Sequence, residues 1–108
     1  MKTLELVCVN GLKDIATKNF EAMMAFELGI DDLELLNEYA LLQAKAYMLT
    51  TNKGIAQLQE TSKYNLPGGC TMIVYRFTIN QKEKLFVATI YDSGCNNCYP
   101  NAKVTAKK

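Results

Sequence analysis

Alternation of apolar and polar residues predicts a β-strand near the start of the chain. Residues 3–9 alternate with a period of two, which is typical of a half-buried strand. Leu4, Leu6 and Cys8 fall on its apolar face, and Asn10-Gly11 then provides a turn.

A second alternating region covers residues 70–80 and is followed by a polar reverse and by another strand at 84–92. Two such strands joined by a short polar segment predict a β-hairpin. We expect one face of its first strand to contribute to the core, with side chains from Ile73, Tyr75, Phe77 and Ile79.

Between these strands the apolar residues recur at steps of three and four, which predicts helices. The first helix is expected over 12–28, the second over about 32–50, and a short third one over 55–62. Asp31 followed by Glu34 has the spacing of a capping box and predicts the start of the second helix.

The second predicted helix is apolar over an unusually wide arc. One stripe has heptad-like spacing, and further apolar residues widen it. We therefore expect this helix to be buried on more than one side or shared with a partner. The stripe is Leu35, Tyr39, Leu42, Ala46 and Leu49, and the widening residues are Leu36, Ala40, Leu41 and Tyr47.

Together these elements predict a single α+β domain over residues 1–108 with the order β-α-α-(α)-β-β. The expected architecture is a small, mainly antiparallel, three-stranded sheet with the helices packed on one face. Residues 100–108 are basic and rich in small residues, and we expect them to form a flexible tail.

Composition narrows the range of functions. The chain has no histidine, so it lacks the commonest general base and the commonest zinc ligand. No apolar run approaches the roughly 20 residues of a membrane-spanning helix, and Glu5 interrupts the short apolar N-terminus. We expect a soluble cytoplasmic protein that is not an enzyme and does not bind a membrane.

Four cysteines are the main candidate for specific chemistry. If Ile79 lies opposite Lys84, Cys70 falls opposite residue 93, beside the Cys-x-x-Cys pair Cys95 and Cys98. The predicted trace also brings Cys8 to this edge. The four thiols are candidate zinc ligands, a redox pair is a second interpretation, and free cysteines are a third, under which no cofactor is needed.

Charge is unevenly distributed, since residues 1–60 carry five lysines against nine acids, a balance of −4, and residues 61–108 carry a balance of +5. We predict a small binding protein that acts through protein–protein contact, as an inhibitor, immunity-type protein or adaptor, with homodimerisation through the second helix or a hairpin edge as one option. The expected interaction surface contains Leu36, Tyr47, Met48, Arg76, Lys82 and Lys84.

The alternative is a zinc-stabilised or nucleic-acid-binding module. Aromatic residues among basic ones can stack bases on a sheet, and the candidates are Tyr75, Phe77, Tyr91 and Tyr99. Against this, Tyr75 and Phe77 share the face expected to form the core.

Overall fold

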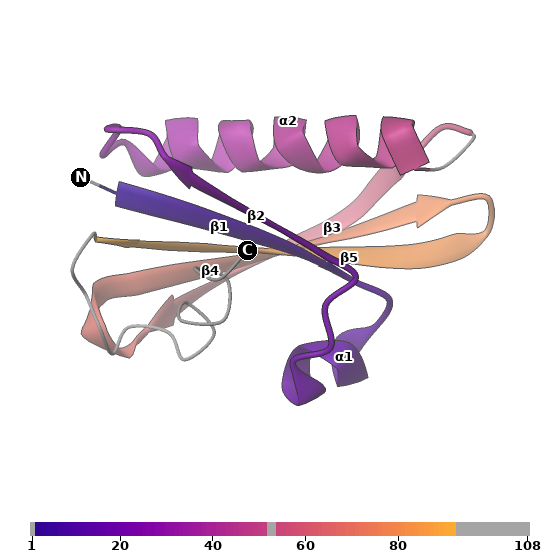
Figure 1. The fold of residues 1–108 in the computed structure, drawn as a ribbon, viewed down its shortest axis with the longest axis horizontal. Coiled ribbons are helices and arrows are strands. Elements are labelled where there is room, and N and C mark those ends of the chain that lie inside the picture. The colour runs from indigo at the N-terminus through magenta and orange to yellow at the C-terminus, as the bar shows by residue number, and fades with distance from the viewer. Residues whose placement is uncertain (1, 52–53, 93–108) are drawn as a thin grey trace.

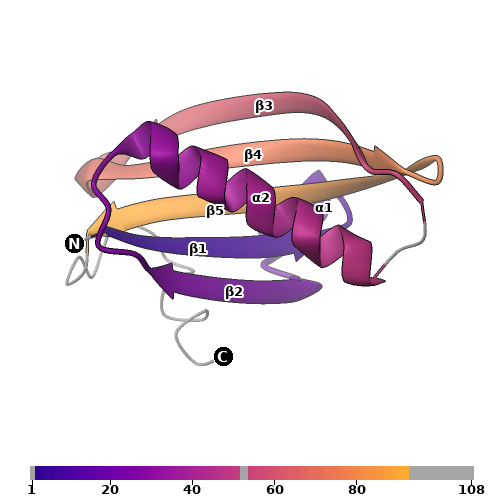
Figure 2. The same cartoon turned by 90° about the horizontal axis from the view of Figure 1, so that it is seen from above.

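The computed structural model describes residues 2–51 and 54–92, which form an antiparallel five-stranded sheet crossed on one face by a long helix (Figure 1). The sheet order is β2-β1-β5-β4-β3 (Figure 2). The strands are β1 (Lys2–Val9), β2 (Ala22–Glu27), β3 (Gln57–Leu66), β4 (Cys70–Ile79) and β5 (Lys82–Asp92), and the helices are α1 (Leu12–Thr17), α2 (Leu33–Thr51) and the 3-10 turn η1 (Pro67–Gly69).

The α+β class and the antiparallel sheet are confirmed, but the predicted element order is wrong. The chain runs β-α-β-α-β-β-β, with five strands where three were expected. Of the two α-helices, α2 covers one face of the sheet, whereas the short α1 lies at one end of the sheet on the other side (Figure 1).

The predicted helix over 12–28 is wrong beyond Thr17. Lys18 adopts a left-handed conformation with φ of 60° and ends α1, and the chain then returns beside β1 as β2. Alternate residues Ala22, Met24 and Phe26 pack against the core. Residues 22–27 are mostly good helix formers, but pairing with β1 overrides that weak local preference.

The predicted third helix over 55–62 is also wrong, because residues 57–62 belong to strand β3, which pairs with β4. β3 is an edge strand whose side chains are mostly exposed. A strand with so few buried side chains does not show alternating apolar and polar residues in its sequence. Its charged residues, including Glu60 and Lys63, are typical of edges that resist pairing with other chains.

Helix α2 begins one residue later than the capping box predicted. The Oδ1 atom of Asp32, rather than Asp31, accepts hydrogen bonds from the backbone N–H groups of Glu34 at 2.9 Å and Leu35 at 3.4 Å. Asp32 therefore satisfies two of the free N–H groups at the helix start.

The β4–β5 hairpin is confirmed, but its register differs by two residues from the prediction. Ile79 pairs with Lys82, not with Lys84, because the turn contains only Asn80 and Gln81. Both turn residues have positive φ, of 51° and 65°. This is the two-residue turn whose twist matches that of the flanking strands.

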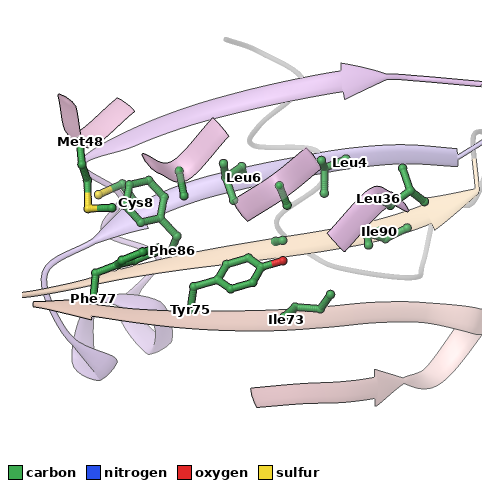
Figure 3. Close-up of a cluster of buried hydrophobic side chains, with 13 residues drawn as sticks. Leu4, Leu6, Cys8, Leu36, Met48, Ile73, Tyr75, Phe77, Phe86 and Ile90 are labelled. Atoms are coloured by element: carbon green, nitrogen blue, oxygen red, sulfur yellow. The ribbon is translucent and has the colours of Figure 1, made fainter. Parts of the chain in front are cut away.

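The core lies between α2 and the sheet (Figure 3). Phe86 is fully buried and contacts Phe77 and Tyr47 edge-on, with ring centroids 5.9 and 5.8 Å apart. The buried Tyr75 hydroxyl donates to the backbone carbonyl of Asn37 at 3.2 Å, which satisfies its polar group. The other buried members are Leu4, Leu6, Cys8, Leu36, Ala40, Ala44, Met48, Ile73, Ala88 and Ile90.

Within the two described ranges, neither helix has the length and apolar content that crossing a membrane requires.

Candidate protein-binding surface

The outer face of α2 carries three exposed leucines that we call the leucine ridge: Leu35, Leu42 and Leu49. Their exposed fractions are 50%, 61% and 75%. A helix of a two-layer fold normally places polar residues on its outer side. Here the outer side presents a row of large apolar side chains instead.

Helical geometry places the ridge on one line. Residues seven apart differ by only about 20° around a helix, and the 14 residues from Leu35 to Leu49 span about 21 Å along the axis. The residues that α2 buries against the sheet include Ala40 and Ala44. These alanines lie on the opposite side of the helix from Leu42, so the ridge points directly away from the sheet.

The two flanks of the ridge differ in chemistry. Rotation by 100° per residue places Glu38 and Lys45 on one flank, and both are exposed. The same rotation places Tyr39 and Ala46 on the other flank. Tyr39 is half-buried, and its ring contacts the ring of Phe26 edge-on with the two centroids 5.2 Å apart. This contact packs the Tyr39 flank against the protein.

A hollow of about 200 Å³ lies at the C-terminal end of the ridge. Its lining combines Leu49 and Lys45 from α2 with Ile55 and Ala56 from the segment before β3, and with Ile79 from β4. Ile55 is 84% exposed. The apolar surface therefore continues past the end of the helix.

The predicted apolar members of the interaction surface lie elsewhere. Leu36 and Met48 are buried in the core, on the side of α2 that meets the sheet (Figure 3), so neither is available to a partner. Tyr47 is half-buried, with its ring against Phe86. The second helix does have a broad apolar arc, but its exposed part is the ridge and not these residues.

The predicted basic members have different surroundings in the structure. Arg76 lies near Glu60 and Glu83, with N···O distances of 3.4 Å to each. Lys84 is mostly buried, and its Nζ contacts the Glu21 carboxylate and donates to the Asn10 side chain at 3.0 Å. Lys82 is exposed at the start of β5.

These ion pairs also bear on the uneven charge of the two halves. Arg76 with Glu60, and Lys84 with Glu21, each join a basic residue of the C-terminal half to an acid of the N-terminal half. Part of the opposite charge of the halves is therefore matched inside the molecule.

The structure does not bring Cys8 and Cys70 together. Cys8 pairs with Phe86, whereas Thr71, the neighbour of Cys70, lies level with Ile90 and so with Leu4. The two thiols are separated by at least four strand residues, roughly 14 Å, and Cys8 alone belongs to the core under α2. They cannot share a zinc ion, whose bonds to sulfur are about 2.3 Å.

Both described cysteines are free and buried. Burial raises the pKa of the Cys8 thiol to about 12, an effect that Glu21 adds to and Lys84 opposes. Burial also raises the pKa of Cys70. Cys95 and Cys98 lie outside the described residues, and within those residues no group of three or more potential metal ligands is found.

A buried carboxyl lies on the sheet face away from α2. Glu5 is 3% exposed, and the Tyr91 hydroxyl donates to its Oε1 atom, while Oε2 has no hydrogen-bond partner among the described residues. Burial raises the pKa of Glu5, and the bond from Tyr91 opposes that rise. No sequence pattern indicates this pair, since Glu5 and Tyr91 are 86 residues apart.

The three aromatic residues considered for base stacking that the structure describes are not free to stack. Tyr75 and Phe77 are buried beneath α2, as expected for the core face (Figure 3). Tyr91 is engaged with Glu5. Tyr99 lies outside the described residues.

A scan of protein-family models, a search of curated proteins and a search of solved structures each find no match to this chain.

Proposed function

We propose that this chain is a non-enzymatic binding protein that acts through protein–protein contact, and that the leucine ridge of α2 is its contact surface. The observation that carries the proposal is the exposure of Leu35, Leu42 and Leu49 in one line on the outer face of an otherwise well-packed helix. Contiguous apolar patches on a protein surface mark interaction sites more often than scattered apolar residues do.

The chemistry of the ridge suits this role. Leucine side chains provide apolar area that is released from water on contact, at roughly 25 cal/mol per Å². The charged flank formed by Glu38 and Lys45 can select the partner and its orientation. Inhibitors, immunity-type proteins and adaptors all act through such preformed surfaces.

The test compares Leu42→Glu with a matched control, Leu12→Glu. Both leucines are exposed, at 61% and 72%, but Leu12 lies on α1, away from the ridge. The wild-type protein and Leu12→Glu should retain the same bound protein from an extract of the native cell, and Leu42→Glu should lose it. Retention of the same proteins by all three, or of none, would contradict the proposal.

A further inference from the structure

We infer that the leucine ridge is self-complementary and binds the ridge of a second copy of this chain, with the two α2 helices antiparallel and a two-fold axis at Leu42. This inference rests on the proposed function and names the partner of the same surface. It follows from how the residues of the ridge and its flanks are spaced about Leu42.

The spacing along the ridge is symmetric. Leu35 and Leu49 lie seven residues before and after Leu42. When a second helix is rotated about an axis through Leu42, Leu42 meets its own copy and Leu35 meets Leu49 of the other chain. All three leucines of one ridge then contact leucines of the other, as an isologous interface requires.

The charged flank is complementary under the same rotation. A two-fold axis that lies between the helices and perpendicular to them keeps each flank on its own side. Glu38, four residues before Leu42, then lies beside Lys45 of the second copy, three residues after it. The pair occurs twice in the dimer and joins opposite charges each time.

The other flank is complementary in size. The same rotation sets the half-buried Tyr39 of one copy beside the small, exposed Ala46 of the other. A large side chain facing a small one allows two helices to approach closely. A parallel arrangement lacks these matches, because its two-fold axis runs along the helices and sets the Glu38 and Lys45 flank of one copy against the Tyr39 and Ala46 flank of the other.

The experiment is a charge swap followed by sedimentation equilibrium on the purified full chain. The wild type should form a dimer with a dissociation constant of about micromolar order, since a contact centred on one helix is small. Glu38→Lys and Lys45→Glu should each weaken it about tenfold, because each creates two like-charge contacts. Circular dichroism checks that each variant is folded.

Two further samples separate pairing from a general effect of charge. The double variant Glu38→Lys with Lys45→Glu has the wild-type composition and should recover the wild-type dissociation constant. An equimolar mixture of the two single variants should form heterodimers, because both contacts are then attractive. Leu42→Glu should be monomeric.

The inference is overturned if the wild type stays monomeric up to about 1 mM, or if the single swaps leave the dissociation constant unchanged. A second result is that the wild type is monomeric and still retains a different protein in the capture experiment, in a way that depends on Leu42. That result would overturn self-association alone. The proposed function would survive that result, whereas loss of ridge-dependent capture would count against the proposed function itself.

Discussion

The Tyr91 hydroxyl donates a hydrogen bond to the carboxylate of Glu5 on the sheet face away from α2. The two residues belong to neighbouring strands in the middle of the sheet, where Glu5 lies opposite Thr89 and Tyr91 opposite Thr3. Glu5 is thus a buried acid held by a diagonal cross-strand contact, and its second oxygen has no partner in the part of the chain that the structure describes. Such a group costs stability when it is charged.

Replacing Glu5 with Gln should stabilise the protein at pH 7 by about 1 kcal/mol, because it removes a buried charge and keeps an acceptor for Tyr91. The pKa of Glu5 is raised above its ordinary value of 4.5, so the folded state binds more protons between pH 4.5 and the raised pKa. Wild-type stability should therefore fall as pH rises through that window. Urea unfolding from pH 4 to 8 should show this slope for the wild type and a weaker slope for Glu5→Gln.

Replacing Tyr91 with Phe should destabilise the protein at pH 7, which is the opposite of the effect expected for Glu5→Gln. Tyr91→Phe removes the hydrogen bond that the carboxylate of Glu5 accepts from Tyr91 and keeps the carboxylate buried, which should cost about 1–3 kcal/mol. Tyr64→Phe is the matched control, because Tyr64 lies on edge strand β3 with 48% of its surface exposed. Equal effects of the two substitutions on the urea midpoint would contradict this role of Tyr91.

Replacing Phe86 with Ala should destabilise the protein by about 3–5 kcal/mol, since a fully buried ring with two edge-on neighbours is lost. Leu12→Ala should change the free energy of unfolding by no more than about 0.5 kcal/mol, because Leu12 is exposed. Both are measured by urea denaturation. A loss below about 1 kcal/mol for Phe86→Ala would mean that the core is not packed as described.

Replacing Gln81 with Gly should stabilise the β4–β5 turn by up to about 1 kcal/mol. Gln81 has a positive φ, which costs side-chain-bearing residues energy, and Asn-Gly is the preferred pair for this turn. Gly54→Ala should act in the opposite direction, since Gly54 has φ of 120° and a Cβ there would overlap the Asn80 side-chain amide. Thermal melting of the two variants should give shifts of opposite sign.

The Cys8 and Cys70 thiols should be unreactive in the folded protein. Both are buried, and burial raises both pKa values, that of Cys8 to about 12. In a variant with Cys95 and Cys98 replaced by Ser, a thiol reagent at pH 8 should react only after denaturant is added. Rapid labelling of either remaining thiol without denaturant would contradict the burial of that residue.

The elements that sequence could predict are those whose pattern reflects burial. Strands β1, β4 and β5 lie inside the sheet. The sequences of β1 and β4 alternate, β5 has a continuous run of buried residues, and α2 has both a capping signal and a long apolar stripe. The edge strands β2 and β3 were predicted as helices, because an edge strand has one hydrogen-bonded neighbour and exposes more of its side chains. These segments form strands because they pair with a neighbouring strand of the sheet, and the composition of a short segment does not reveal such pairing.

The candidate surface was predicted only in part, for a related reason. The sequence shows that α2 is apolar over a wide arc but does not state which part meets the sheet. Ala40 and Ala44 provide the missing signal, because small side chains allow the helix to approach the sheet closely. The face that carries them is buried, and Leu35, Leu42 and Leu49 on the opposite face are exposed.

The position of β1 between β2 and β5 has a consequence for how this chain is made in the cell. Within the described residues its first strand pairs with its last, since Lys2 lies opposite Asp92. During synthesis β1 can pair with β2 early. Its second neighbour, β5, is made only after nearly all of the described chain. Until then the edge of β1 that pairs with β5 has unsatisfied backbone N–H and C=O groups, so we expect the sheet to be completed late.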